Sequence, residues 1–299
     1  MGWRLEGSTL VPILMSLPPV PDYCLELISC SCTSRCMSAR CMCKKSHVAL
    51  LHCPDLPLTV VEEILLYLPG QQVICVCRLV CKEWKLVVDS TAFWRERCRR
   101  EGFKPLSIPN VPRYWQAFYF LCKMRRNLLK NPNADEKFTG WKILQNGGNQ
   151  WAIENLFAPH PDDTVTKCFV TSYGRCIKSQ LINLEKEGYR PAFMDKIQPD
   201  IVISDWYAAR WDCGSVYEIR VELLDNKKKV IKFFEPEQVT IPQWNDQQWK
   251  QVTHTFKDYG PGVRFILFKH GGQDTQFWAG HYGIRVTNSI VEIFPATEG

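Results

Sequence analysis

The sequence of 299 residues lacks any apolar run that reaches the roughly 18 residues needed to cross a bilayer, so stable membrane insertion is not expected. It also lacks a basic stripe interleaved with aromatic residues, and its formal net charge of +6 is modest, so nucleic acid is not an expected partner. A clear signal peptide is missing as well, because only Arg4 precedes a short apolar stretch that prolines interrupt. Hydrophobic residues nevertheless make up 45% of the chain, which indicates a folded, globular protein.

The 15 cysteines do not have the spacing of a structural zinc site. Those near the amino terminus form C-x-C steps, whereas structural zinc sites prefer C-x2-C pairs. We expect residues 1–50 to be a poorly ordered, Cys-rich extension, with a loose thiol-rich metal site as the alternative. The remaining cysteines are scattered among apolar neighbours, which favours a reducing compartment. We therefore expect a cytoplasmic protein with no resident metal and no cofactor.

Residues 51–103 have the pattern of three short helices. In the first helix, five apolar residues recur at helical spacing: Val60, Val61, Ile64, Leu65 and Leu68. The dipeptide Pro69-Gly70 is expected to end this helix, and Thr91 is expected to cap the third one. Three short helices make a very small core, so this unit should need a partner or a neighbouring domain for its stability.

Residues 104–133 contain one further amphipathic helix, which we interpret as a linker. Its apolar positions recur at i, i+3, i+4 and i+7: Trp115, Phe118, Tyr119 and Cys122. Lysines and arginines follow, as suits the carboxyl end of a helix dipole, and they predict a solvated helix end. Pro132 is expected to end the helix.

Residues 134–299 change from the helical period to a period of two. In the segment 215–224, the residues expected to face inward alternate with charged ones and are Tyr217, Ile219, Val221 and Leu223. Many such segments follow without crossover helices, which predicts an antiparallel sandwich. The expected fold class is α+β multidomain: a small three-helix unit, a helical linker and an antiparallel β-sandwich.

Two known domains resemble these segments. Residues 51–103 resemble an F-box, through Leu56-Pro57, Leu68-Pro69, Arg78-Leu79-Val80-Cys81 and Trp84. Residues 134–299 resemble the F-box-associated domain of the glycan-reading F-box-only proteins, a galactose-binding-like sandwich. The stretches that carry this second resemblance are FVTSY, PDIVISDWYAARWDCGS, YGPGVRF and HGGQDTQFWAG.

The resemblance implies a substrate-recognition subunit of an E3 ubiquitin ligase rather than an enzyme. An F-box docks on the Skp1 adaptor, and through it on a cullin-RING ligase, by inserting apolar side chains into a groove of the partner. The residues expected at this contact are Leu56, Pro57, Ile64, Leu65 and Leu68. Packing within the helical unit itself is the alternative role of these side chains.

The sugar-reading members of this family bind the chitobiose core of high-mannose N-glycans on misfolded glycoproteins, which are then ubiquitinated for ER-associated degradation. By resemblance, the glycan-binding residues here are Phe169, Asp212, Phe277 and Trp278. Aromatic rings stack on the C–H face of a pyranose, and a carboxylate accepts hydrogen bonds from its hydroxyl groups. Gly271, Gly272 and Gly280 are expected to let the loops curl. Phe277 stands where the sugar-reading members have tyrosine, so one hydroxyl is missing.

Other functions remain compatible with these residues. The sandwich could recruit protein substrates independently of glycans. A sandwich-fold glycosidase would need two carboxylates across the sugar, for which Asp212 and Asp274 are the candidates. A thiol nucleophile or a metal site would draw on Cys168, Cys176, Cys213, His254, His270 and His281. No recognised spacing supports such a site, and we expect core cysteines and surface histidines instead.

Overall fold

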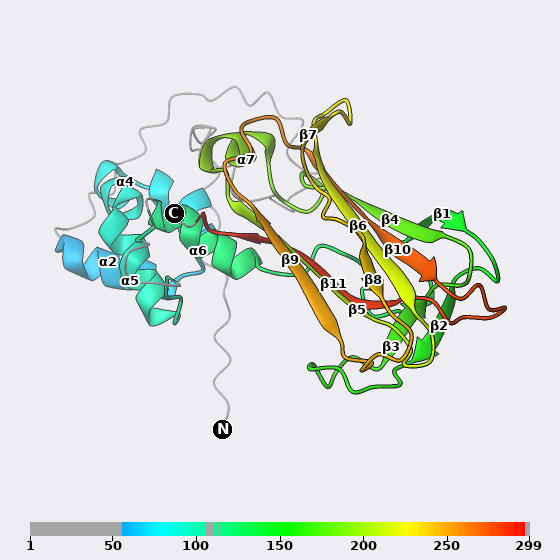
Figure 1. Cartoon of the computed structure of the whole chain (residues 1–299). Helices are drawn as coiled ribbons and strands as arrows, with labels where there is room; N and C mark the ends of the chain where they lie inside the picture. The colour runs from blue at the N-terminus through cyan, green and yellow to red at the C-terminus, as the bar shows by residue number, and fades with distance from the viewer. Residues whose placement is uncertain (1–55, 106–110, 113, 297–299) are drawn as a thin grey trace. The chain divides into compact units, whose positions relative to one another are not determined.

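The structure, a computed structural model, describes residues 56–105, 111, 112 and 114–296. The predicted Cys-rich extension lies outside the described residues. The chain divides into two compact units, with the boundary after Phe120, and Figure 1 follows it from the helices to the strands. Within the described ranges, no helix is long and apolar enough to cross a membrane.

The first unit is made of short helices. They are α2 (Leu58–Tyr67), α3 (Gly70–Cys75), the 3-10 helix η2 (Cys77–Leu79), α4 (Lys82–Asp89), α5 (Thr91–Arg100) and the start of α6 (Trp115–Met124). Between Pro69-Gly70 and Thr91, where the second of the three predicted helices would lie, the structure has three separate elements: α3, η2 and α4. Ser90, not Thr91, caps α5, because its hydroxyl accepts a hydrogen bond from Phe93 N at 3.2 Å. The helix α6 ends at Met124, well before Pro132.

A buried arginine joins two helices of the first unit. Leu65, Phe93 and Trp94 are at most 1% exposed and lie at the centre of its core. Arg97 of α5 donates hydrogen bonds to the carbonyl oxygens of Leu65 and Leu68, at 3.3 and 2.6 Å. These carbonyls lie at the carboxyl end of α2, where a helix lacks its full set of internal partners. Arg97 therefore fixes the end of α2 against α5.

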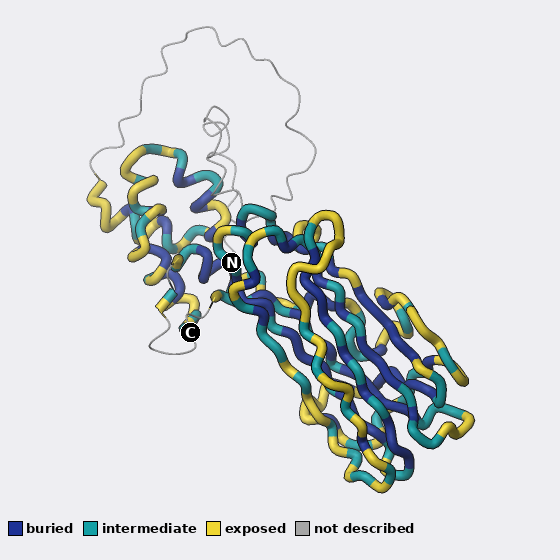
Figure 2. Tube along the Cα trace, turned by 45° about the horizontal axis from the view of Figure 1, so that its top comes forward, coloured by how far each residue is buried: buried dark blue, intermediate teal, exposed yellow. Residues whose placement is uncertain are grey.

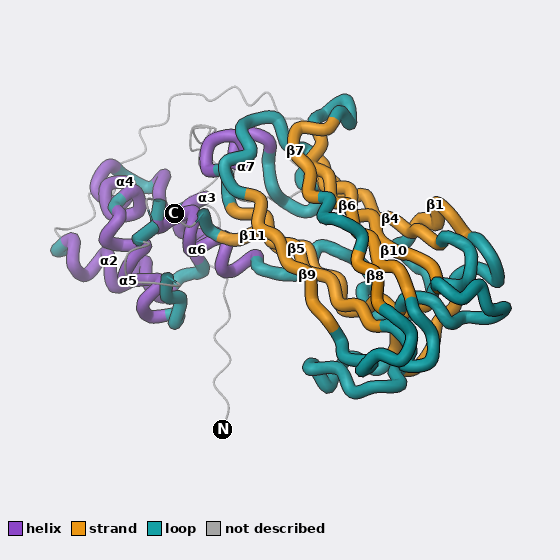
Figure 3. Tube along the Cα trace, viewed as in Figure 1, coloured by secondary structure: helices purple, strands orange, loops and turns teal. Residues whose placement is uncertain are grey.

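The second unit is an antiparallel β-sandwich, which confirms the predicted fold (Figure 3). Sheet A has the strand order β1-β4-β10-β6-β7, with β8 also paired to β6, and sheet B has the order β2-β3-β11-β5-β9. The strands of sheet A are β1 (Lys142–Asn146), β4 (Cys176–Asn183), β6 (Ser215–Leu224), β7 (Val230–Phe234), β8 (Val239–Ile241) and β10 (Phe265–Asp274). Those of sheet B are β2 (Ala152–Asn155), β3 (Lys167–Val170), β5 (Asp200–Ala208), β9 (Lys250–Phe256) and β11 (Arg285–Phe294). A short helix, α7 (Pro191–Ile197), separates β4 from β5 in the sequence.

The alternation predicted for residues 215–224 is confirmed in β6 as far as Val221, after which Glu222 and Leu224 are buried as well. Four residues, each at most 3% exposed, face the core: Tyr217, Ile219, Val221 and Leu223. On the opposite face, Glu222 pairs with Lys269 of β10 at 3.0 Å. The central strands carry the longest buried runs, drawn dark blue in Figure 2, so the core lies between the two sheets.

A chain of polar side chains crosses the core of the sandwich. His270 of β10 contacts Asp205 of β5 through Nδ1 at 2.5 Å and Lys178 Nζ of β4 through Nε2 at 2.6 Å. The Asp205 carboxylate also accepts hydrogen bonds from the hydroxyl groups of Tyr217 and Ser289, at 2.6 and 2.7 Å. These residues come from both sheets, so the chain joins the two layers. The expectation that the histidines lie at the surface is wrong for His270, whose partners are in the core.

The folded state is expected to lose stability through His270 as the pH falls from 6.5 to about 4. Burial outweighs the attraction of Asp205 and lowers the pKa of His270 from 6.5 to about 4. In this range an unfolded chain binds a proton at His270 that the folded chain does not bind. The free energy of unfolding should therefore decrease by up to about 1.4 kcal/mol per pH unit. Amide hydrogen exchange in β10 during urea denaturation across the range measures this slope. His270→Gln should flatten it, and an unchanged slope would contradict the assignment.

Candidate functional site

Exposed aromatic rings gather in the loops that connect the strands of the sandwich. Among the described residues of the second unit, five large aromatic side chains in loops are 40–71% exposed: Phe157, Trp211, Trp244, Phe277 and Trp278. Loops on a rigid scaffold are common places for binding residues, and grouped apolar surface marks a contact site. These rings are therefore the starting point for locating the site.

The loop between β10 and β11 turns both Phe277 and Trp278 outward. The Oδ1 atom of Asp274 accepts hydrogen bonds from the N–H groups of Gln276 and Phe277, at 3.0 and 2.6 Å. This turn leaves Phe277 with a φ of 57°, in the left-handed region that bulky residues rarely adopt. Neighbouring residues of a strand would point to opposite faces, whereas here the two residues are 71% and 40% exposed. Backbone strain that exposes two rings points to a function for them.

Contacts from two neighbouring loops hold the tip of the β10–β11 loop. Gly280 N donates to Asn149 Oδ1 at 2.9 Å, and Gly280 O accepts a hydrogen bond from Ser172 Oγ at 2.6 Å. His281 Nε2 lies 3.1 Å from Asn149 O. Gly280 has a φ of 127°, and a Cβ atom there would lie 2.8 Å from the Tyr282 ring. The loop therefore needs glycine at this position, as predicted.

Gly271 and Gly272 lie within β10 and not in a loop, so the prediction that they let a loop curl is wrong. A Cβ atom on either residue would lie 2.0 or 1.8 Å from a backbone oxygen, that of Cys176 or Val216 respectively. These two glycines instead let the neighbouring strands β4 and β6 approach β10 closely.

An arginine connects the ring pair to the predicted Asp212. Trp278 packs edge-on against Tyr282, with ring centroids 5.7 Å apart, and the Arg210 guanidinium lies 4.8 Å from the centre of the Tyr282 ring. Arg210 donates to both carboxylate oxygens of Asp212, at 2.9 and 3.3 Å. This hydrogen bonding holds the pKa of Asp212 below its usual value, so the carboxylate stays ionised. The structure thus brings Asp212, Phe277 and Trp278 to one surface.

Phe169 is not part of this surface, so its predicted contact with a glycan is wrong. Phe169 lies in β3 with 0% exposure, and its ring packs in the core against Phe138, with centroids 5.3 Å apart. The aromatic residue of the stretch FVTSY that reaches the loops is Tyr173, which the sequence prediction missed. Tyr173 is half-buried, follows the loop contact Ser172, and has its ring beside Gly148. The position of Tyr173 just after β3 could have indicated from the sequence that this ring lies in a loop.

The predicted adaptor-binding residues of the first unit differ in exposure. Leu56, Pro57 and Ile64 are exposed, Leu68 is half-buried, and Leu65 is 0% exposed. The prediction that Leu65 contacts a partner is wrong, because this side chain packs inside the helical unit. Further exposed apolar residues of the same unit, which the prediction missed, are Leu58, Val60, Tyr67, Val80 and Leu86. So much exposed apolar surface on a small unit marks a protein contact.

The residues considered for catalysis are not placed for it. Burial raises the pKa of Cys168 to about 12 and that of Cys213 to about 11, so neither thiol ionises near neutral pH. Asp274 is 0% exposed and binds N–H groups of its own loop, so it cannot face Asp212 across a sugar. In the part of the chain that the structure describes, no cluster of three or more potential metal ligands occurs.

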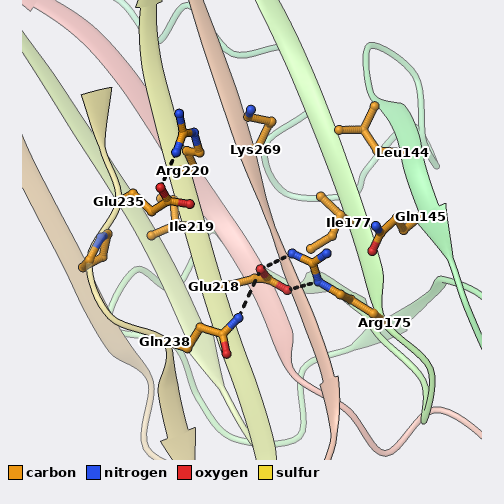
Figure 4. Close-up of a pocket in the computed structure, with 11 residues that line it drawn as sticks. Leu144, Gln145, Arg175, Ile177, Glu218, Ile219, Arg220, Glu235, Gln238 and Lys269 are labelled. Atoms are coloured by element: carbon orange, nitrogen blue, oxygen red, sulfur yellow. Dashed lines mark hydrogen bonds and ion pairs between the residues drawn. The ribbon is translucent and has the colours of Figure 1, made fainter. Parts of the chain in front are cut away.

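A cavity of about 250 Å³ lies over sheet A (Figure 4). Arg175 pairs with Glu218 at 2.5 Å across one part of it, and Arg220 pairs with Glu235 across another. These charges neutralise one another and already have partners, so they offer little to a charged ligand. The aromatic cluster in the loops is the stronger candidate for the functional site.

Two protein families match parts of the chain. Residues 53–96 match the F-box domain, and residues 119–293 match the F-box associated region. The second range spans nearly all of the sandwich, including every loop that contributes to the aromatic cluster.

Curated relatives match most of the chain. F-box only protein 6 from Bos taurus is 49% identical over 250 residues, which covers 82% of this chain and 94% of the relative. F-box only protein 44 from Homo sapiens is 44% identical over 245 residues, which covers 81% of this chain and 96% of the relative. Among solved structures, TmCBM61 in complex with beta-1,4-galactotriose is similar with a TM-score of 0.36 and 12% identity, covering 58% of this chain and 99% of that chain. This last likeness is too remote to bear on the ligand.

Proposed function

The chain belongs to the F-box only proteins that combine an F-box domain with an F-box associated region, and from this premise we propose that it is the substrate-recognition subunit of a Skp1–cullin–F-box ubiquitin ligase. In this proposal the sandwich binds the chitobiose core of high-mannose N-glycans on misfolded glycoproteins. The helical unit docks on the Skp1 adaptor, so that the bound glycoprotein is ubiquitinated for ER-associated degradation.

The observation that supports glycan binding most directly is the exposure of two adjacent rings, Phe277 and Trp278. The C–H face of an N-acetylhexosamine can stack on these rings, and the ionised Asp212 can accept hydrogen bonds from its hydroxyl groups. Tyrosine in place of Phe277 would add one hydroxyl, worth about 0.5–1.5 kcal/mol, while stacking does not depend on it. Tyr173 and Tyr282 are half-buried nearby and provide further rings at the edge of the site.

This function needs no chemical step from the chain itself. A subunit that holds the substrate beside the ubiquitin donor raises the effective concentration of the reacting groups. The proposed compartment is the cytoplasm, where buried thiols such as Cys168, Cys176 and Cys213 remain reduced.

Titration of the full chain with chitobiose tests the glycan part directly. Saturable binding is expected, and its absence would overturn the glycan proposal. The second candidate function, recruitment of proteins independently of glycans, is tested with a denatured high-mannose glycoprotein before and after its N-glycans are removed. Equal binding of the two forms would favour protein recruitment, and selective binding of the glycosylated form would favour glycan recognition.

The variant Ile64→Glu is expected to bind the Skp1 adaptor at least about tenfold more weakly than the unaltered chain. Ile64 is 43% exposed on α2, so a charge there is tolerated in the free protein. In an apolar interface the same charge would have to be desolvated without a partner. Calorimetric titration of the full chain with purified Skp1 measures the change.

Leu144→Glu provides the matched control for the adaptor experiment. Leu144 is 44% exposed and lies on β1 of the sandwich, so the chemical change is the same but the predicted contact is not touched. Adaptor binding should be unaltered in this control. Equal effects of the two substitutions, or no effect of either, would remove Ile64 from the interface.

A further inference from the structure

A second pair of exposed aromatic rings lies beside Asp212. Trp211 precedes Asp212 in the loop between β5 and β6, and Trp244 lies in the loop between β8 and β9. The two ring centroids are 5.0 Å apart, with an interplanar angle of 50°. Trp211 is 49% exposed and Trp244 is 65% exposed, so neither ring belongs to the core.

Three hydrogen bonds fix these two loops to each other. Asn245 N donates to Trp211 O at 3.2 Å, and the Asn245 side-chain amide donates to Arg210 O at 2.5 Å. The side-chain amide of Gln243 donates to Asp212 O at 3.0 Å. The acceptors are three consecutive residues, the outer two of which form the ion pair of the proposed glycan site. These hydrogen bonds therefore hold the loop of Trp244 next to the Arg210–Asp212 ion pair.

Trp244 shares an unusual backbone conformation with Phe277. Their φ angles are 64° and 57°, and within the described ranges they are the two aromatic residues with a left-handed φ. Bulky side chains rarely adopt this conformation. In both positions the strained turn holds the residue outward, at 65% and 71% exposure. Strain that exposes a large ring is better explained by a ligand than by folding.

The two ring pairs belong to one continuous surface. Trp278 contacts Tyr282, the Tyr282 ring lies beneath Arg210, and Arg210 is the neighbour of Trp211 in the chain. Along this path of contacts, the Arg210–Asp212 ion pair lies between the two ring pairs.

The chemistry around Trp244 fits a neutral, hydroxyl-rich ligand. Beyond the amides that join the loops, the same loop supplies the side-chain amides of Gln247 and Gln248, which donate and accept hydrogen bonds, and the carboxylate of Asp246, which accepts them. Indole faces beside amides suit a pyranose ring. A peptide segment would instead favour strand-edge backbone groups or aliphatic pockets.

We propose that Trp211 and Trp244 form a second pyranose-binding subsite, which contacts the mannose residues attached to the chitobiose core. This inference rests on the proposed function of the neighbouring site. It makes affinity depend on glycan length, because chitobiose alone occupies the first ring pair and an extended glycan occupies both.

Titration of the full chain with chitobiose and with the trimannose-extended chitobiose core tests the subsite. The unaltered chain should bind the extended glycan about tenfold more tightly than chitobiose. Trp244→Ala should remove most of this gain and change the chitobiose affinity by less than about twofold, and Trp211→Ala should act in the same direction. Phe233→Ala, which removes a ring that is 54% exposed on β7, should change neither affinity.

The outcomes separate this inference from the function on which it rests. If the unaltered chain binds both sugars equally, the subsite is wrong and the proposed function stands. The subsite is also wrong if Trp244→Ala weakens both sugars alike or neither of them. If Trp244→Ala weakens the binding of a sugar-free denatured protein but not the binding of either sugar, the surface is a peptide contact. A chain that binds neither sugar overturns both proposals.

Discussion

The variant Asp205→Ala is expected to lose about 3–5 kcal/mol of its free energy of unfolding, because it breaks the buried polar chain between the two sheets. Asp205 is 0% exposed, and its carboxylate is the shared acceptor for Tyr217, Ser289 and His270. Alanine leaves these buried donors without that acceptor, and each unsatisfied group is costly. Burial lowers the pKa of Lys178 and the Asp205 carboxylate opposes this shift, so the variant should lower the pKa of Lys178 further.

Measurement of this loss must report on the sandwich alone, since a chain of two units need not unfold in one step. Amide hydrogen exchange in β5 and β10 during urea denaturation meets this requirement. Asp163→Ala is the matched control, because Asp163 is an exposed aspartate in the loop between β2 and β3. It should change the free energy of unfolding by less than about 0.5 kcal/mol. A loss of less than about 1 kcal/mol for Asp205→Ala would show that the polar chain is not a main source of stability.

The sandwich could be predicted because its central strands obey a local rule. In β6 the residues from Ser215 to Val221 alternate between buried and half-buried, and this alternation is visible in the sequence without knowledge of the partner strands. The loop that bears Phe277 could be located for a similar reason. Two adjacent rings among glycines cannot both enter one core from an extended strand.

Where an element is buried on both faces, the sequence pattern does not predict which way a single side chain points. In β3 the consecutive residues Cys168, Phe169 and Val170 are all 0% exposed, so no alternation tells which ring points to a ligand. On α2, Ile64 and Leu65 are adjacent and equally apolar, yet one is 43% and the other 0% exposed. The packing of α4 and α5 against α2 decides between them.

Contacts between distant segments were beyond local prediction. Trp211 and Trp244 meet because hydrogen bonds join two separate loops, and no pattern in either loop predicts the other. The buried contact of Lys178 with His270 likewise depends on the pairing of β4 with β10. Charged residues in a strand pattern are read as surface residues unless their partners are known.

The variant Trp278→Ala is expected to bind chitobiose roughly 30-fold more weakly than the unaltered chain, or not measurably. Trp278 is 40% exposed, and its T-shaped contact with Tyr282 holds the indole ring in place, so little conformational entropy is lost on binding. Alanine removes the stacking surface but keeps the turn, because the turn is formed by backbone N–H groups that donate to the Asp274 carboxylate. Titration of the full chain with chitobiose, and its retention on an immobilised high-mannose glycoprotein, measure the loss.

Two further variants decide whether the loss comes from the ring itself. Trp278→Phe keeps an aromatic face of smaller area, so its affinity should fall between those of the alanine variant and the unaltered chain. Phe233→Ala removes an exposed ring outside the loop cluster and should leave the affinity unchanged. Amide hydrogen exchange in β5 and β10 should be the same in all of these variants, which excludes unfolding of the sandwich as the cause. If Trp278→Ala keeps the full affinity, the aromatic pair is not the glycan site; if Trp278→Phe is as weak as Trp278→Ala, stacking is not what holds the sugar.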